Sequence, residues 1–334
     1  MINYNGEKFV GKEDLYKCIC SWLNTDYPYF EFIFVENGST DESLEVLKRA
    51  LSKHPLIPTK VIKLRENVGF GIAAEKGISE SEGDFIVLVC NDERVLSRMW
   101  LKHFLKAIKR REVGAVFAKK VKWNNKKIID AVGLTINPIG IVSQIGRGEV
   151  DNGRWDKIQE CLIWQTPVMF PKSLFKKGEF FDKDYVVVNN DVDSSLRIWL
   201  KGYKILVVPS VVVEHKRCAT LRQLPVEFVV FHARKNTIQT LIKNYEIRNL
   251  IKWLPITLLV YFSAILYYFS IKRTDQAKAT IKAILWNVTN LKRTLRKRFY
   301  VQRYVRKIPD KEILKLMNKF DPIELLKREK AWPK

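Results

Sequence analysis

Short apolar runs alternate with helix-forming segments over the first 120 residues of the chain. Runs typical of strands lie at 30–35, 61–64, 85–90 and 113–117, with helical patterns at 39–51 and 72–79 between them. Ser39 and Glu42 have the spacing of a capping box, with Ser39 as N-cap of the first of these helices. Alternating strands and helices predict an α/β fold, in which helices flank a mostly parallel, doubly wound sheet.

Polar residues follow three of these strands at the point where each strand ends. The segments are Glu36-Asn37-Gly38-Ser39, Arg65-Glu66-Asn67 and Asn91-Asp92-Glu93. Open parallel sheets bind ligands beyond the carboxyl ends of their strands. Asn, Gly and Ser also form ordinary turns, so each segment by itself has a purely structural explanation. Three such segments at equivalent strand ends favour a binding site.

The stretch from about 120 to 215 is less regular. Gly146-Arg147-Gly148 is followed by an aromatic and acidic stretch at 180–193, and then by a helical pattern at 196–200 that stops at Gly202. Residues 203–208 are typical of a strand, which we expect to break at Pro209. A further apolar run at 211–213 leads into Glu214-His215.

The positive charge of the chain belongs mainly to its last third. The net charge is +23, and the residues from Arg234 onward contain 24 Lys or Arg and 7 Asp or Glu. Such a basic segment could meet nucleic acid, anionic lipid or an anionic substrate. Five scattered cysteines without metal-ligand spacing indicate reduced thiols in a cytosolic setting, and the N-terminus lacks the pattern of a signal peptide.

Taken in order, these polar segments resemble the motifs of a known family. Residues 35–41 are similar to a V-D-N-x-S-T-D nucleoside-binding segment, 67–71 to an N-x-G-F turn, and 91–93 to a metal-binding D-x-D element. Residues 190–193, with Arg197 and Gly202-Tyr203 after them, resemble an E-D-x-D…R…G-Y acceptor segment. From Asn3 to about Leu316 the chain thus resembles the family 2 inverting glycosyltransferases of GT-A fold, and their rhamnosyltransferase-like branch in particular.

The resemblance implies a Rossmann-like GT-A domain and a nucleotide-sugar donor. The donor-binding residues that it implies are Asn3, Tyr4, Asn5, Glu36, Asn37, Gly38, Ser39, Asn67, Gly69, Phe70, Gly71 and Asp92. It also implies a divalent metal, Mn²⁺ or Mg²⁺, with Glu93 as the first ligand and Asn91 and His215 near it. A hard cation at this place would neutralise the leaving diphosphate.

The resemblance further implies that Asp191 is the general base that removes the proton of the acceptor hydroxyl, in a single displacement with inversion. Acceptor contacts are expected from Asn190, Asp193, Arg147, Arg197 and Trp164. Asp193 either shares a face with Asp191, if this segment is extended, or serves the positive end of the helix that follows. His215 and Glu93 also have structural explanations, as a satisfied histidine and a helix cap.

Three substitutions and a short N-terminus depart from the family pattern. Glu36 and Glu93 replace aspartates, and Asn190 replaces a glutamate beside the base. The chain begins almost at Asn3, so most of the first strand is missing from this sequence. The loss of a central strand would be costly, and we therefore expect a misassigned start codon rather than an abbreviated strand.

The segment 253–271 contains no charged residue. Its nineteen residues rise about 28 Å as a helix, close to the ~30 Å hydrocarbon core of a bilayer. A single span would carry the basic tail across the membrane, against the positive-inside tendency, so we expect a helix or hairpin in the membrane interface. Apolar residues at helical spacing from Ile281 to Phe299, opposite lysines and arginines, predict a basic amphipathic helix. The alternative is that both segments pack onto the catalytic domain or a second subunit.

These observations predict a catalytic domain over 1–232, with a nucleotide-sugar half at 1–120 and an acceptor half at 121–232, and a helical, membrane-associating region over 233–334. The expected acceptor is a glycan or a lipid-linked glycan of surface polysaccharide or glycoprotein assembly, reached from the cytoplasmic face of the membrane by a peripheral or monotopic enzyme. A homo-oligomer is compatible with this prediction.

Three other classes of protein compete with the transferase. A catalytically inactive scaffold is allowed by the three substitutions. A nucleic-acid-binding protein is suggested by charge alone, but it leaves the Asn-Asp-Glu and Asn-Asp-Val-Asp segments unexplained, so no nucleic-acid partner is expected. A nucleotidyltransferase would need a glycine-rich basic phosphate loop near the N-terminus, which the sequence lacks.

Overall fold

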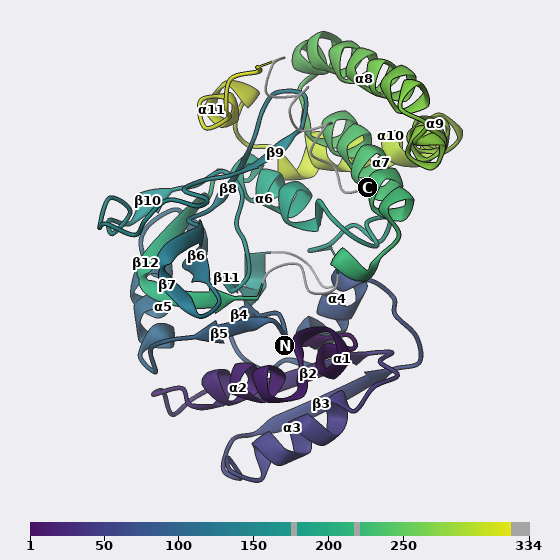
Figure 1. Ribbon diagram of the computed structural model, residues 1–334. Helices are drawn as coiled ribbons and strands as arrows, with labels where there is room; N and C mark the ends of the chain where they lie inside the picture. Colours follow the sequence, from purple (N-terminus) through teal and green to yellow (C-terminus); the bar gives the residue numbers. More distant parts are fainter. Residues whose placement is uncertain (175–178, 217–220, 322–334) are drawn as a thin grey trace. The chain divides into compact units, whose positions relative to one another are not determined.

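The computed structural model describes residues 1–174, 179–216 and 221–321, which belong to two compact units (Figure 1). Unit 1 comprises Met1–Leu134, Gln144–Val186 and Tyr203–Gln223. Unit 2 comprises Thr135–Ser143, Val187–Gly202 and Leu224–Lys334. The chain passes between the units repeatedly.

The first sheet of unit 1 is parallel, as the sequence predicts. Its three strands lie in the order β1 (Ile2–Asn3), β2 (Phe32–Asn37) and β3 (Thr59–Leu64). Four helices occur in the same stretch of chain: α1 (Gly6–Val10), α2 (Lys12–Leu23), α3 (Ser43–Leu51) and α4 (Phe70–Glu80). Ile2 also forms a parallel bridge with Cys90, so β1 joins this sheet to the end of β4 (Phe85–Leu88).

The second sheet of unit 1 is mixed rather than mostly parallel. Its order is β10-β12-β6-β11-β4, with β5 paired to β12 and β7 paired to β6. The strands after β4 are β5 (Glu93–Val95), β6 (Val113–Lys122), β7 (Asn125–Ala131), β10 (Gln159–Glu160), β11 (Val168–Pro171) and β12 (Lys204–His215). Strands β6 and β12 are parallel, whereas β11 is antiparallel to both β6 and β4. The remaining helices of the unit are α5 (Trp100–Ile108), η1 (Lys172–Leu174) and η2 (Leu221–Gln223).

The core of unit 1 follows from helical and strand periodicity. Leu15, Ile19 and Leu23 lie on one face of α2 and are buried in the same cluster as Phe34 of β2 and Phe104 of α5. Burial of each such side chain contributes roughly 1.5–3 kcal/mol, which holds the helices onto the sheets and fixes the strand ends between them.

Two local predictions are wrong. Helix α3 begins at Ser43 and not after Ser39, because the Ser39 hydroxyl is bonded to Glu36 and an Asp41 oxygen accepts the Ser43 amide proton at 3.1 Å. Strand β12 is not broken at Pro209 but continues through it, since its register against β6 shifts between Val208 and Val212. A β-bulge of this kind accommodates a proline, which cannot donate to the ladder.

A cavity of about 460 Å³ lies beside β1 in unit 1. Its lining includes Ile33 and Val35 of β2 and Phe85 and Val87 of β4, together with Met1. These side chains make the cavity largely apolar. It is separate from the polar strand ends described below.

Unit 2 is mainly helical. Its helices are α6 (Asn190–Leu200), α7 (Val226–Asn244), α8 (Ile247–Ser270), α9 (Thr274–Thr289), α10 (Leu291–Tyr300), the π-helix η3 (Val301–Val305) and α11 (Asp310–Leu314). A short pair of strands, β8 (Leu134–Ile136) and β9 (Val142–Gln144), lies mostly in this unit. Helix α7 packs against α6, α8, α9 and α10. The expected helical C-terminal region is therefore confirmed.

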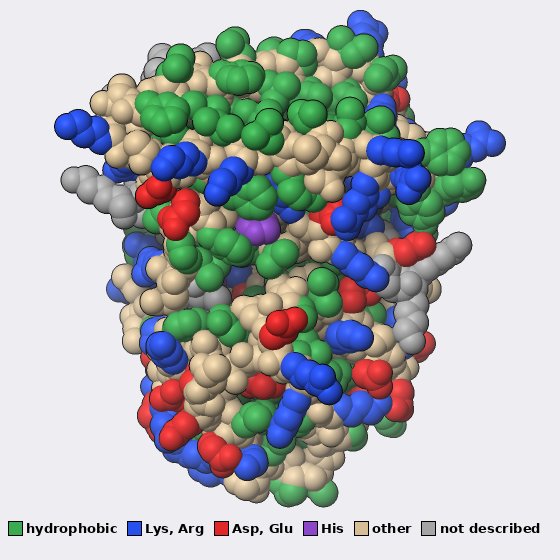
Figure 2. All heavy atoms as spheres, turned by 90° about the vertical axis from the view of Figure 1, so that its right-hand side faces the viewer, with side chains coloured by type: hydrophobic (Ala, Val, Ile, Leu, Met, Phe, Trp, Pro, Cys, Tyr) green, Lys and Arg blue, Asp and Glu red, His purple; other side chains and the backbone are tan. Residues whose placement is uncertain are grey.

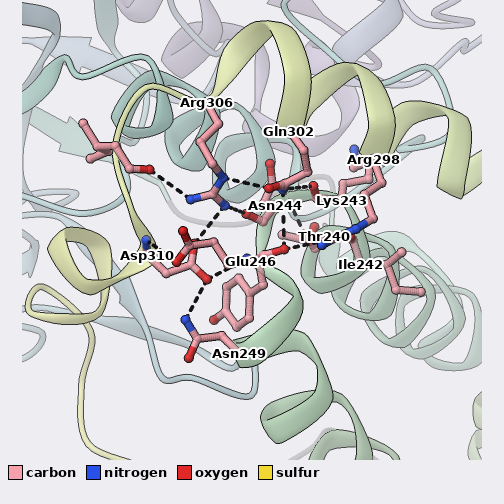
Figure 3. A network of polar contacts seen from close by, with 12 residues as sticks. Thr240, Ile242, Lys243, Asn244, Glu246, Asn249, Arg298, Gln302, Arg306 and Asp310 are labelled. Carbon is pink, nitrogen blue, oxygen red and sulfur yellow. Dashed lines mark hydrogen bonds and ion pairs between the residues drawn. The ribbon is translucent and has the colours of Figure 1, made fainter.

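Part of the basic charge of the C-terminal region caps α7 (Figure 3). Arg298, Gln302 and Arg306 donate hydrogen bonds to main-chain carbonyls of residues 242–245 at the end of this helix. Asp310 lies 2.8 Å from Arg306 and holds its guanidinium in place. The last carbonyls of a helix lack partners within it and carry partial negative charge. Arg298 and Arg306 therefore stabilise α7, and this part of the basic charge is already engaged within unit 2.

Candidate active site

Polar side chains at the carboxyl ends of β1, β2 and β4 form one hydrogen-bonded network. Asn91 Nδ2 donates to Asn3 Oδ1 at 2.7 Å, and Asn3 Nδ2 donates to Glu36 Oε2 at 3.0 Å. The Ser39 hydroxyl donates to Glu36 and accepts the Asn5 amide proton at 2.8 Å. The sequence predicts all five residues at the site, and the structure brings them together.

The loops after β2 and β3 are tied to each other by a second network. Asn37 Nδ2 donates to Asn67 Oδ1 at 3.0 Å, and that oxygen also accepts the Gly69 amide proton at 2.9 Å. Gly38 has φ +74°, and a Cβ there would lie 2.3 Å from a main-chain carbon of Glu66. Glycine is therefore required where these two loops approach each other.

The other predicted donor residues border these networks. Tyr4 makes an edge-to-face contact with Phe9, with ring centroids 6.0 Å apart. Phe70 begins α4 and meets Phe181 edge-on at 5.7 Å, while Gly71 is buried in the same helix. Their contacts with a nucleotide remain predictions.

The carboxyl group of Glu36 is buried at the centre of the first network. Burial raises its pKa above the ordinary range, whereas the hydrogen bonds from Ser39 and Asn3 act in the opposite direction. Each of its two oxygens already accepts a hydrogen bond from one of these neighbours. A carboxylate has about four lone-pair sites, so Glu36 retains capacity for a ribose hydroxyl or a base.

A histidine between two carboxylates lies at the end of β12 in unit 1. Nε2 of His215 is 3.4 Å from Asp92 Oδ2, and Nδ1 is 2.7 Å from Asp130 Oδ2. A carboxylate behind a histidine fixes its tautomer and directs the other nitrogen toward a metal. Sequence reasoning missed Asp130, although a lone acidic residue in the apolar run of β7 was a usable signal.

The two carboxylates decide the protonation of His215. Burial and the charge of Lys120 lower its pKa, but Asp92 and Asp130 outweigh both, so the pKa lies above its ordinary value. Burial raises the pKa of Asp92, but attraction to His215 and Lys120 outweighs burial, so this pKa lies below its ordinary value. In the absence of metal, His215 and Asp92 therefore favour a cation–anion pair.

Glu93, the first expected metal ligand, already has a cationic partner. Its side chain is 0% exposed, with Oε1 at 2.5 Å from Lys120 Nζ and 2.6 Å from Thr166 Oγ1. Cys90, Asp92 and Glu93 have potential ligand atoms within 4.8 Å of one another. Lys120 nevertheless already neutralises the Glu93 carboxylate.

Asp92 and His215 fit a divalent cation better than Asn91 and Glu93 do. The Asn91 amide is engaged by Asn3. The 3.4 Å between Asp92 Oδ2 and His215 Nε2 is close to the ~3 Å that separates neighbouring ligands of an octahedral ion with bonds of about 2.1 Å. A carboxylate and an imidazole form a donor set that Mn²⁺ accepts.

Removal of the charge behind the histidine is expected to weaken metal binding. Asp130→Asn should lower the affinity for Mn²⁺ by about 10–100-fold, because the amide no longer fixes the ring as a carboxylate does. Isothermal titration calorimetry of the purified protein measures the change. Asp156→Asn is the control, since this carboxylate pairs with Lys119 elsewhere in unit 1. Equal affinities for both variants would contradict the assignment.

The same site gives opposite pH dependences for metal binding and for metal-free stability. Mn²⁺ affinity rises with pH through the raised pKa of His215, since the metal needs the neutral ring. The protonated ring stabilises the metal-free fold fully below its ordinary pKa of about 6.5, and this stabilisation is lost as pH rises through the raised value. In Asp130→Asn both transitions should move to lower pH.

Asp191 lies in the first turn of α6 in unit 2, so the segment is helical and not extended. The two residues before this helix, Val188 and Asn189, have φ of +52° and +61°. Asn236 Nδ2 donates to the carbonyls of Val187 and Val188, at 2.9 Å each, and holds this left-handed turn. A backbone of this kind costs of order 1–3 kcal/mol per residue, and such strain clusters at functional sites.

Asp193 and Arg197, for which acceptor contacts are expected, form a buried ion pair. Asp193 is 1% exposed and lies 3.2 Å from Arg197 Nε and 2.8 Å from Lys243 Nζ. Asn244 of α7 donates to the same carboxylate at 2.9 Å. Asp193 lies in the first turn of α6, as the helical alternative expects, and its side chain joins α6 to α7.

The remaining predicted acceptor residues differ in exposure. Trp164 is buried in unit 1 against Phe180 and Phe181, which argues for a structural role. Arg147 is exposed in the turn that contains Gly146 and Gly148. Asn190 is buried in unit 2, and its Oδ1 has no hydrogen-bond partner among the described residues.

The parallel and mixed sheets, with polar residues at their carboxyl ends, define a glycosyltransferase of GT-A fold. Residues 1–178 match the family model described as "Glycosyl transferase family 2". The chain belongs to this family, which confirms the family resemblance but not the rhamnosyltransferase-like branch.

Two curated relatives cover most of the chain. A "Dolichyl N-acetyl-alpha-D-glucosaminyl phosphate 3-beta-D-2,3-diacetamido-2,3-dideoxy-beta-D-glucuronosyltransferase" of Methanococcus voltae is 24% identical over 247 residues, 70% of each chain. A "Cholesterol galactosyltransferase" of Borreliella burgdorferi is 23% identical over 313 residues, 84% of this chain and 76% of the relative.

Solved structures share the fold at low identity. Residues 1-349 of S. aureus TarS, in complex with UDP-GlcNAc, have a TM-score of 0.55 at 16% identity, over 91% of this chain and 89% of that TarS chain. The mannosyltransferase PcManGT of Pyrobaculum calidifontis, in complex with GDP-Man and Mn²⁺, has a TM-score of 0.51 at 17% identity, over 86% of this chain and 85% of PcManGT.

Proposed function

We propose that this glycosyltransferase moves a sugar from a nucleoside-diphosphate sugar to an acceptor hydroxyl, with inversion at the anomeric carbon. The observation that carries the proposal is the convergence of Asp92 and His215, oriented by Asp130, beside the Asn3–Glu36 network at the strand ends. The carboxylate–imidazole pair suits a cation bound to the diphosphate, and the polar network at the strand ends suits the nucleoside beside it.

Asp92 and His215 would hold the divalent cation, Mn²⁺ or Mg²⁺, at the diphosphate. When bound, the cation supplies Lewis-acid neutralisation of the charge that develops on the leaving nucleoside diphosphate. Glu36, Asn37 and Asn67 would orient the nucleoside, because their loops are fixed by the hydrogen bonds between them. Preorganised groups of this kind lower the barrier because they need no rearrangement during the reaction.

Asp191 is proposed as the general base. Its carboxylate takes the proton of the acceptor hydroxyl as the acceptor oxygen forms its bond to the anomeric carbon. The bond from that carbon to the diphosphate breaks on the opposite face, and its electron pair leaves with the nucleoside diphosphate. The turn that Asn236 supports fixes the start of α6, and with it the place of Asp191 within unit 2.

The acceptor is proposed to be a lipid-linked glycan, and the transferred sugar a hexose or rhamnose. The names of the Methanococcus and Borreliella relatives describe transfer to lipid-bearing acceptors. The order of motifs, from 35–41 to 190–193, is most similar to the rhamnosyltransferase-like branch. Cys18, Cys20, Cys90 and Cys161 are free thiols, which agrees with action from the cytoplasmic face of the membrane.

The test is release of nucleoside diphosphate by the purified chain from a panel of hexosyl and rhamnosyl donors, with Mn²⁺, Mg²⁺ or a chelator. The proposal predicts turnover of one donor class, and loss of turnover with the chelator. Binding of a donor without turnover in the presence of lipid-linked acceptors would favour a scaffold. Failure to bind any nucleotide with metal would refute the proposed donor site.

A further inference from the structure

Helix α8 carries an apolar stripe that the described residues of unit 2 leave uncovered. Its exposed apolar residues recur at intervals of three or four along one face: Ile247, Ile251, Pro255, Leu259, Phe262, Leu266 and Phe269. Leu259 is 66% exposed and Leu266 is 71% exposed. By length and composition this helix could cross a membrane, and it is the one described helix that meets those criteria.

The opposite face of α8 is occupied by protein. Ala264, Ile265 and Tyr268 pack against Ala277 of α9, and Tyr261 packs against Ile238 of α7. The guanidinium of Arg234 lies 4.4 Å from the ring centroid of Tyr261 on this side. A helix with one face packed against protein and one apolar face uncovered is suited to an interface rather than to a span.

The uncovered surface continues over α9 and α10. Leu285, Val288, Leu291, Leu295 and Phe299 are exposed at helical spacing. Figure 2 shows hydrophobic side chains gathered in a broad band over the part of this face that α8 and α9 form in Figure 1, with Lys and Arg side chains along its lower border. Contiguous exposed apolar surface of this kind marks an interaction site.

The positive charge around this apolar surface favours an anionic partner. Residues 247–307 contain 14 Lys or Arg and a single acidic residue, Asp275. Those that are exposed include Lys252, Lys272, Lys282 and Lys292. Two copies of this surface would oppose cation to cation, which disfavours self-association. A nucleic acid would satisfy the cations but not the apolar stripe.

We propose that α8, α9 and α10 dock on the surface of an anionic lipid bilayer, with the apolar stripe of α8 lying among the headgroups and upper acyl chains. The 24 residues of α8 would then lie along the membrane over a length of about 36 Å. The basic border would meet the anionic headgroups, each cation near the surface adding to the attraction. This docking surface is independent of the proposed chemistry of sugar transfer.

The test is flotation of the purified full chain, without detergent, with phosphatidylcholine vesicles that contain or lack phosphatidylglycerol. The wild type should float with the anionic vesicles, and less as salt increases. The double variant Leu259→Asp/Leu266→Asp should bind at least about tenfold more weakly, because the stripe loses apolar area and gains charge repelled by the lipid. Lys282→Glu/Lys292→Glu should abolish the preference for anionic vesicles.

The control is Leu56→Asp, which changes an apolar residue that is 92% exposed in unit 1. It should float as the wild type does, and circular dichroism should show all variants folded. Equal flotation of the α8 double variant and the wild type would overturn the proposal, as would failure of the wild type to bind. If light scattering finds a dimer that the α8 substitutions dissociate, and no form floats, the surface joins two copies of the chain.

Discussion

Asp191→Asn lowers the rate of sugar transfer by about 10²-fold or more, and leaves the affinity for the nucleotide donor unchanged. The amide has the shape of the carboxylate but cannot accept the proton of the attacking hydroxyl. Asp191 belongs to α6 in unit 2, whereas the proposed nucleoside contacts belong to unit 1, so the loss should appear in kcat and not in donor binding. Initial rates of nucleoside diphosphate release, with donor binding by calorimetry, measure both effects.

The chain provides a matched control for this substitution. Asp275 also lies in the first turn of a helix of unit 2, α9, but it is exposed and has no proposed role in the reaction. Asp275→Asn should retain wild-type turnover. A rate for Asp191→Asn within about threefold of that control would show that another group acts as the base.

Asp193→Ala destabilises the protein by about 3–5 kcal/mol, although this residue is only two positions from the proposed base. The truncation leaves Arg197 and Lys243 as buried cations without the carboxylate that lies 3.2 and 2.8 Å from them. Removal of one member of a buried ionic network is costly, because the remaining charges cannot regain their hydration. Urea unfolding followed by circular dichroism measures the loss.

Asp193→Asn should cost less than the alanine variant, since the amide still accepts a hydrogen bond from Asn244. Asp275→Ala, at the exposed first-turn position of α9, should change stability by no more than about 0.5 kcal/mol. Equal stability of Asp193→Ala and Asp275→Ala would contradict the structural role of Asp193. The two aspartates of the Asn-Asp-Val-Asp segment are thus expected to have different roles. Substitution of Asp191 should change the reaction rate, and substitution of Asp193 should change the stability of the fold.

The parallel part of the fold and the location of the donor side were predictable from local patterns. Apolar runs that end in polar residues indicated the strand ends, and glycines such as Gly38 marked loops that approach closely. The mixed second sheet was not predictable in the same way. The antiparallel pairing of β11 with β4 joins segments about eighty residues apart, and no local pattern encodes it.

The sequence alone does not show which charged residues of the site are paired with each other. Sequence order placed Glu93 where the family has a metal ligand, but the partner that neutralises it, Lys120, lies on β6, 27 residues away. Asp130 acts through His215, which is 85 residues away in the chain. The apolar segment of the C-terminal region was expected to form a helix or a hairpin, and it forms a single helix, α8. Only the structure separates the buried face of this helix from its exposed stripe.

The left-handed turn before α6 bears on how this enzyme could be engineered. A β-branched valine at φ +52° is a poor choice for stability, and glycine at position 188 would relieve the strain. Selection for thermostability alone would therefore favour this replacement. Because the turn leads directly into Asp191, the more stable chain would hold its proposed base less firmly, and gains in heat resistance at this position would be made at the expense of turnover.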